Sequence, residues 1–296
     1  MSSAALIISV SLFALIVTGY LAQSRLPPPR PKIIGIDLGT TFSCVATYES
    51  KSGNVTVYKD DNGKRIIPSV VAILDESVLV GYKAVQQIET NSKNTIYDAK
   101  RFIGKKYTPQ GISKFTSNYP FQLGVDDKGD PHFKVSLSTG VKEFTPEDIG
   151  AFILRRLKKM AEVEIDRSIE MAVISVPADF DDAQRNATVQ AGAMAGLKIL
   201  RVISEPTAAA LAYGLHKKVG TNTVIVIDFG GGTLDVSLLL VQGGMFITMA
   251  MAGNNRLGGQ DVNNNLINFF KEMIEKKFER SINIPNDLQV ILCYLL

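Results

Sequence analysis

The chain has 296 residues, of which 46% are hydrophobic and 21% are charged. This composition is typical of a globular protein with one large domain or two lobes, and it excludes a disordered or collagen-like chain. The formal net charge is only +3, from 32 basic and 29 acidic residues, so the composition indicates no nucleic acid partner. Two cysteines and two histidines exclude a disulfide framework and a histidine-based zinc site, which leaves oxygen ligands for any metal ion.

An apolar leader occupies residues 1–22, and no charged residue precedes Arg25. Its unbroken apolar run of about 19 residues is long enough to cross a bilayer and also fits a signal peptide. Because the small residue Ala22 offers a cleavage site, we favour a cleaved secretory signal over a retained anchor or a buried helix. Membrane contact is then expected only through an uncleaved leader. The expected location is the endoplasmic reticulum or microsomes, or outside the cell after secretion.

A proline-rich spacer at 23–31 separates the leader from the folded sequence, because proline is excluded from helix interiors and central strands. Entry into the secretory pathway would expose two glycosylation sequons, at Asn54 and Asn186. Both are weak signals, since such tripeptides arise by chance.

The first lobe is predicted to cover residues 32–217. Apolar runs bounded by turn residues predict strands at 33–38, 42–47, 55–59, 66–74 and 78–81. Helical spacing then runs from 84 to 105, and the segment 107–144 alternates weakly between turn pairs. We expect an antiparallel subdomain inserted at about 69–144.

The clearest helix begins after Thr145, which can form a capping box with Asp148 around Pro146. The elements that follow alternate between strands and helices, which predicts an α/β protein. Strands are expected at 171–176, 198–203, 223–228, 234–241 and 245–251, and helices at 181–195, 207–215 and 260–280. Residues 218–283 are assigned to part of a second lobe, and 284–296 to an apolar tail.

One short pattern occurs twice. Ile36-Asp37-Leu38-Gly39 is followed by threonines and a strand, and Ile227-Asp228-Phe229-Gly230 is followed by two glycines, a threonine and a strand. A glycine turn lets backbone N–H groups approach an anion, and an adjacent carboxylate suits Mg²⁺. The repeat therefore suggests two related lobes that grip a di- or triphosphate between them.

Three further residues belong to the same hypothesis. Glu205 stands where a strand gives way to a helix, a usual place for ligand groups in α/β folds. Asp235 follows the second glycine turn, and Lys100 lies in the helical segment. By pattern alone, Lys100 is more simply a solvated helix charge.

Four segments carry a family resemblance: IGIDLGTT at 34–41, DAKRFIG at 98–104, EPTAAA at 205–210 and DFGGGTLD at 228–235. In order and spacing they closely resemble the ATPase domain of the seventy-kilodalton heat-shock chaperones, over about 32–282. A leader joined directly to this domain looks most like a microsome-associated member of the family that has no peptide-binding domain. The resemblance implies an actin-like (ribonuclease H-like) fold with two lobes around a nucleotide cleft.

The resemblance also implies ATP or ADP as ligand, Mg²⁺ as cofactor, and roles for single residues. Gly39, Thr40, Thr41 and Phe42 would form one phosphate loop, and Gly230, Gly231, Gly232 and Thr233 the other, with Thr233 also counted as catalytic. Asp37 and Asp228 would hold Mg²⁺ largely through its waters. Glu205 and Asp235 would orient the attacking water, and Lys100 would stabilise charge on the γ-phosphoryl group. Co-chaperones and client proteins of the secretory pathway are the implied partners.

After about residue 280 the chain departs from the family pattern, with the apolar tail in place of further sheet. We therefore expect an incomplete second lobe, a truncated product, weak nucleotide binding and marginal stability. Two other functions stay open: a small-molecule kinase of the actin-like superfamily, and a non-catalytic interaction module at the endoplasmic reticulum membrane.

Overall fold

The structure is a computed structural model that describes residues 11–19, 21, 33–50, 52–116, 118–217, 219–282, 284, 288, 290–291 and 294. The predicted spacer at 23–31 lies outside these residues, as do most of the leader and most of the apolar tail. Residues 11–19 and 21 are helical. Within the described part of the chain, no helix has both the length and the apolar character to cross a membrane.

The first lobe is built on a six-stranded sheet with the strand order β12-β11-β1-β2-β3, to which β4 adds by pairing with β2. Strand β1 runs parallel to β11 and antiparallel to β2, and its alternate residues Ile34, Ile36 and Leu38 are buried. Helix α5 packs on β1 and β2, so one apolar face of the sheet lies in the core. The elements are β1 (Ile33–Leu38), β2 (Phe42–Glu49), β3 (Asn54–Val57), β4 (Ile67–Pro68), α5 (Pro146–Ile165), β11 (Met171–Val176), α6 (Asp182–Met194), β12 (Lys198–Ser204) and α7 (Glu205–Ala212).

The capping box predicted at the start of α5 is confirmed. The Asp148 backbone N–H donates to the Thr145 hydroxyl at 3.1 Å, and the Thr145 backbone N–H donates to the Asp148 carboxylate at 2.9 Å. Pro146 occupies the first turn, where its missing N–H removes no helical hydrogen bond. The long helix that covers the sheet therefore begins where local chemistry dictates.

The region between β4 and α5 holds two small antiparallel sheets, with strand orders β6-β5-β7 and β10-β9-β8. Its elements are β5 (Val71–Ile73), β6 (Val78–Val80), α2 (Tyr82–Val85), α3 (Ile88–Asn91), η1 (Ser92–Asn94), β7 (Thr95–Ile96), η2 (Ala99–Arg101), α4 (Pro109–Thr116), β8 (Gln122–Val125), β9 (Pro131–Leu137) and β10 (Gly140–Phe144).

Three predictions for this part of the chain differ from the structure. The continuous helix expected at 84–105 is broken into short turns, because Thr95 and Ile96 pair with β5 and this tertiary pairing overrides the helical spacing. The segment after 107 begins with helix α4 before its three antiparallel strands. The strand expected at 66–74 is divided into β4 and β5, since Pro68 has no N–H to continue the ladder.

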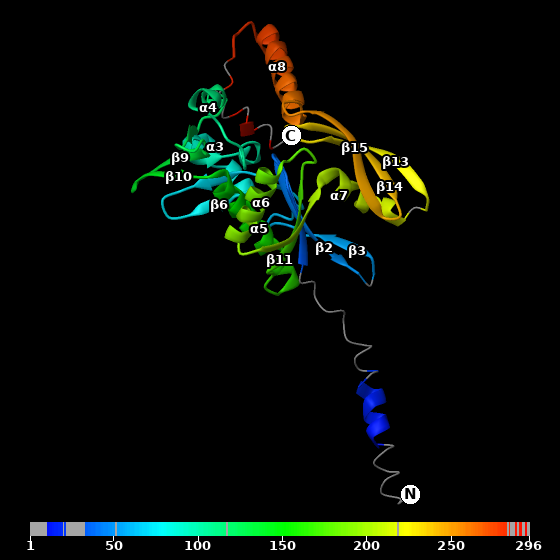
Figure 1. The fold of residues 1–296 in the computed structure, drawn as a ribbon. Coiled ribbons are helices and arrows are strands. Elements are labelled where there is room, and N and C mark those ends of the chain that lie inside the picture. The colour runs from blue at the N-terminus through cyan, green and yellow to red at the C-terminus, as the bar shows by residue number, and fades with distance from the viewer. Residues whose placement is uncertain are drawn as a thin grey trace, which may run out of the picture.

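The second lobe consists of the antiparallel sheet β13-β14-β15 and helix α8. Its elements are β13 (Thr221–Phe229), β14 (Leu234–Gln242), β15 (Met245–Asn254) and α8 (Gly259–Phe278), preceded by the short turn η3 (Leu215–Lys217). Figure 1 shows this sheet, in yellow and orange, projecting from the first lobe, with α8 running away from it. A small core of Ala210, Leu239 and Val241 joins the sheet to α7.

Candidate functional site

A cleft of about 510 Å³ lies between the two lobes. Its walls include every residue that the sequence singled out for phosphate, metal or catalytic chemistry: Asp37, Gly39, Thr40, Thr41, Phe42, Lys100, Glu205, Asp228, Gly230, Gly231, Gly232, Thr233 and Asp235. The two glycine turns come from separate sheets, the first between β1 and β2 and the second between β13 and β14. The structure thus brings both turns to one shared cleft, while the roles of the single residues remain predictions.

Two hydrogen bonds from Ser69 stabilise the first glycine turn. The Ser69 backbone N–H donates to the Thr41 carbonyl at 2.8 Å, and its hydroxyl donates to the Gly39 carbonyl at 2.8 Å. A Cβ atom on Gly39 would collide with the carbonyl oxygen of Phe42, so only glycine fits at this bend. Two carbonyls of this turn are therefore bonded to Ser69, which does not itself line the cleft.

The second turn is held by the first residues of α8. The Gly230 backbone N–H donates to the Thr233 carbonyl at 2.9 Å and closes the turn. The backbone N–H groups of Gly259 and Gln260 donate to the carbonyls of Gly230 and Gly231, at 2.9 and 2.7 Å. Because the first N–H groups of a helix have no partner within the helix, α8 uses them to fix the loop.

The two turns touch across the cleft. A Cβ atom on Gly231 would lie against the side chain of Thr41, at 2.6 Å from its Cβ. The Thr41 hydroxyl is buried and has no hydrogen-bond partner among the described residues. A buried hydroxyl without a partner is costly, so this one is available to a ligand that enters between the turns.

An ion pair joins two distant parts of the first lobe at the floor of the cleft. The Lys100 ammonium donates to Glu205 Oε1 at 2.7 Å, and the two side chains are only 10% and 17% exposed. Lys100 lies in η2, and Glu205 is the first residue of α7. Lys100 also lies over the Phe180 ring, 5.7 Å from its centroid. The cation predicted from sequence is thus held in the cleft rather than in solvent.

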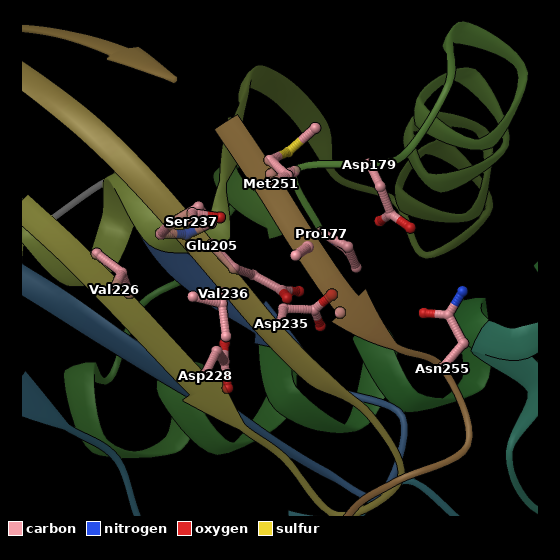
Figure 2. A pocket seen from close by; sticks show the side chains of 14 residues that line it. Pro177, Asp179, Glu205, Val226, Asp228, Asp235, Val236, Ser237, Met251 and Asn255 are labelled. Atoms are coloured by element: carbon pink, nitrogen blue, oxygen red, sulfur yellow. The ribbon is translucent and has the colours of Figure 1, made fainter. Parts of the chain in front are cut away.

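Asp228 and Asp235 lie beside Glu205 (Figure 2). Burial raises the pKa of Glu205, and the charges of Asp37 and Asp228 raise it further, whereas Lys100 lowers it. Burial and Asp37 raise the pKa of Asp228. Burial and Asp179 raise the pKa of Asp235, against a hydrogen bond from Thr233 that lowers it. Burial is therefore the main cause of all three raised pKa values, and the neighbouring carboxylates add to it.

This donor set fits Mg²⁺. Asp37 and Asp228 could supply hard oxygen ligands from opposite lobes, and the Ser175 hydroxyl orients Asp37 by donating to its Oδ1 at 3.1 Å. The described residues contain no ready-made cluster of three or more metal-ligating side chains. Mg²⁺ does not require one, because it is usually bound by one or two carboxylates together with waters and substrate phosphates.

A side cavity of about 260 Å³ continues the cleft under the second sheet. It shares Glu205, Asp228 and Asp235 with the cleft, and Figure 2 shows Asp179 reaching into it from the loop between β11 and α6. Sequence reasoning gave no role to Asp179, nor to Ser69 and Ser175. Their contacts with the predicted residues arise from tertiary packing, so the local sequence carries no signal for them.

Arg101 is a fourth residue that sequence reasoning left without a role. It immediately follows Lys100, lines the cleft and bonds the second lobe. A signal was present in this case, since Arg101 lies inside one of the four segments that carry the resemblance.

Comparison with known proteins agrees with this arrangement. The sequence model of the Hsp70 protein family matches residues 33–292. The chain is 50% identical to heat shock 70 kDa protein 13 of Bos taurus over 272 residues, and 49% identical to that of Homo sapiens over the same length. In both cases the match covers 92% of this chain and 57% of the relative. A ribosome-associated molecular chaperone of Saccharomyces cerevisiae is 44% identical over 260 residues, which is 87% of this chain and 41% of that protein.

The chain therefore spans 57% of the length of the two heat shock 70 kDa protein 13 relatives and 41% of the length of the Saccharomyces cerevisiae chaperone. The family match extends through both glycine turns and the Lys100–Glu205 pair. Together with the mixed α/β architecture of two lobes, it shows that the chain belongs to the Hsp70 family and has the actin-like fold of its ATPase domain.

Proposed function

We propose that this chain binds ATP with Mg²⁺ and hydrolyses it, as an ATPase core of the Hsp70 type. The observation that carries the proposal is the meeting of two glycine turns, from two separate sheets, across one cleft that also holds the Lys100–Glu205 pair. Phosphoryl transfer depends mainly on positioning and electrostatic stabilisation, and these residue types supply both.

The two turns would bind the phosphates. Residues 39–42 and 230–233 offer backbone N–H groups that no Cβ shields at the glycines, except that of Gly230, which closes its own turn. The hydroxyls of Thr40, Thr41 and Thr233 add further donors. The Thr41 hydroxyl, buried without a partner among the described residues, is the donor best prepared for a phosphate oxygen. Asp37 and Asp228 would hold Mg²⁺, which when bound neutralises charge on the phosphates.

The residues at the floor of the cleft would serve the chemical step. Glu205 and Asp235 would orient the attacking water and accept its proton, which their raised pKa favours because a more basic carboxylate accepts a proton more readily. Lys100 would donate to the oxygen on which negative charge develops. Its ion pair with Glu205 keeps the ammonium in place before the substrate arrives.

A thermal-shift titration of the full chain with Mg-ATP tests binding. We expect the melting temperature to rise with ligand concentration, since a ligand that binds only the folded state stabilises it. Asp228→Asn should weaken the Mg²⁺-dependent part of the shift. No shift with wild-type protein would contradict the proposal. The same titration with Mg-ADP, followed by calorimetry, measures whether affinity is as weak as the sequence predicts.

Turnover tests the catalytic assignment. We expect Lys100→Met and Glu205→Gln each to lower the ATP hydrolysis rate by roughly 10²–10³-fold, by analogy with the loss of one donor to a developing oxyanion. Lys83→Met is the matched control, because Lys83 forms an exposed ion pair with Asp61, at 3.3 Å, away from the cleft. Equal rates in all three variants would refute the assignment.

For the cell, we propose the endoplasmic reticulum or microsomes as the location, with co-chaperones and client proteins of the secretory pathway as partners. The apolar leader at 1–22 supports this proposal. Import into microsomes followed by mass spectrometry tests it. The product should be protected from protease, and a mass consistent with cleavage after Ala22 would separate a signal from an anchor.

A further inference from the structure

One guanidinium group joins the two lobes at the second glycine turn. Arg101 Nε donates to Asp98 Oδ2 in the first lobe at 3.0 Å. Its two terminal nitrogens donate to backbone carbonyls of the second lobe, Nη1 to Asn255 at 2.7 Å and Nη2 to Gly232 at 3.1 Å. All three nitrogens of the side chain are therefore engaged, one toward the first lobe and two toward the second.

In the first lobe, Asp98, the partner of Arg101, is held in place by its surroundings. Asp98 is buried and adopts the left-handed backbone region, with φ 58°, which is uncommon for residues other than glycine. Its Oδ2 also accepts a hydrogen bond from the Tyr119 hydroxyl at 3.2 Å. An unfavourable backbone conformation persists only where the surroundings hold it, and such conformations cluster at functional sites. Asp98 and Tyr119 thus fix the direction in which Arg101 points.

The second-lobe end depends on the shape of the turn. A Cβ atom on Gly232 would collide with Arg101 Nη2, so the close approach requires glycine at this position. Within the same turn, α8 already binds the carbonyls of Gly230 and Gly231. The Gly232 carbonyl, in contrast, is bonded to the opposite lobe, so the placement of this turn against the first lobe depends on Arg101.

We propose that Arg101 is a positioning residue that holds the second phosphate turn against the first lobe and so sets how long a nucleotide stays bound. Arg101 acts through the Gly232 and Asn255 carbonyls. When the lobes separate, all bonds from Arg101 to the second lobe break together, and the turn loses its alignment with residues 39–42. This inference rests on the proposed nucleotide-binding function, which the experiment below therefore tests separately.

The test compares Arg101→Gln, Arg101→Lys and a matched control, Arg155→Gln. Like Arg101, Arg155 donates to a backbone carbonyl, that of Met194, at 3.1 Å, but this contact stays within the first lobe and outside the cleft. Stopped-flow release of a fluorescent ADP analogue from the full chain gives the dissociation rate. Hydrogen exchange of the nucleotide-free chain gives the mobility of the second turn at 230–233.

We expect Arg101→Gln to speed ADP release about tenfold, because a hydrogen bond to a charged group contributes about that factor. Arg101→Lys keeps the charge but not the fork geometry, so it should give an intermediate rate. Arg155→Gln should match wild type. Exchange at 230–233 should follow the same order without nucleotide.

The outcomes separate the two claims. Equal release rates from wild type and Arg101→Gln would overturn the positioning role and leave nucleotide binding standing. If wild type binds no ADP, the proposed function fails, and hydrogen exchange alone decides whether Arg101 fixes the turn. Unchanged exchange at 230–233 in Arg101→Gln would then overturn the positioning role as well. If Arg101→Gln fails to fold, Tyr119→Phe is measured in its place, because it removes only a hydrogen bond that helps to hold Asp98. Tyr119→Phe should also speed ADP release and hydrogen exchange at 230–233. No change in either rate would overturn the inference.

Discussion

The two copies of the Ile-Asp-x-Gly pattern have nearly the same sequence and very different surroundings. In the first lobe, Ile36 and Leu38 are each 4% exposed. Their counterparts in the second lobe, Ile227 and Phe229, are 68% and 52% exposed. Both copies nevertheless bring a carboxylate and a glycine turn to the same cleft.

The difference lies in whether a helix covers the sheet. Helix α5 packs on β1 and β2, whereas α8 packs extensively on no other element among the described residues. The apolar side chains of α8 are exposed in turn, among them Val262, Leu266, Phe269, Phe270, Met273, Ile274 and Phe278. The comparison shows that a glycine turn can form on a sheet whose apolar face is uncovered, while the stability of its lobe depends on what covers the sheet.

The largest expected effect is a difference in stability between matched isoleucines. Ile36→Ala should lower the free energy of unfolding by roughly 2–5 kcal/mol, because it opens a cavity in a closed core. Ile227→Ala removes an exposed side chain and should change it by less than about 0.5 kcal/mol. Urea unfolding of both variants and of wild type, followed by circular dichroism, measures the difference.

A large loss of unfolding free energy in Ile227→Ala would contradict this difference between the two lobes. It would mean that the exposed face of β13 is covered in solution, by α8 or by another molecule. Ile225→Ala, on the same face of the strand and 64% exposed, would then show a similar loss.

A smaller contrast is expected between the glycines of the two turns. Gly39→Ala places a Cβ against the Phe42 carbonyl oxygen, and such overpacking should cost about 1–3 kcal/mol. A Cβ on Gly230 would lie 3.5 Å from the Thr233 carbonyl oxygen, an ordinary contact, so Gly230→Ala should be neutral or stabilise by less than about 1 kcal/mol. The same unfolding assay checks both, and an equal loss in the two variants would show that the second turn is as tightly constrained as the first.

The sequence was informative wherever local chemistry decides the structure. Thr145 and Asp148 predicted the start of α5, and the repeated Asp-x-Gly pattern predicted the two turns that line the cleft. The helix expected at 84–105 failed because Thr95 and Ile96 pair with β5, a contact that no local pattern reveals. For the same reason Ser69, Ser175 and Asp179 were found only in three dimensions. The exposure of Ile227, in contrast, agrees with the incomplete second lobe that the sequence predicts.

The smallest expected effect concerns pH. Burial and Asp37 raise the pKa of Asp228 above its ordinary value near 3.9, so the folded state binds a proton more tightly than the unfolded state. Stability therefore falls as pH rises from about 3.9 through the raised pKa, and the full loss remains above it. Because Asp228 is exposed by its surface area, solvent screens part of this effect, and Asp228→Asn should raise the melting temperature of the nucleotide-free chain at pH 7 by on the order of 1 °C.

The control is a carboxylate of the first lobe with the opposite shift. Hydrogen bonds from Arg156 and then Lys83 lower the pKa of Asp61, so its contribution is present above its ordinary pKa and lost as pH falls through the lowered value. Asp61→Asn should therefore lower the melting temperature slightly at pH 7, by less than Asp228→Asn raises it, because Asp61 is 57% exposed and solvent screens its partners. Lowering the pH should reduce the difference in melting temperature between each variant and wild type. For Asp228→Asn, this difference should shrink between the raised pKa of Asp228 and about 3.9. A lower melting temperature for Asp228→Asn at pH 7 would contradict this prediction. It would mean that cationic groups of the two lobes already stabilise the carboxylates of the cleft. The electrostatic argument for a bound cation would then fail.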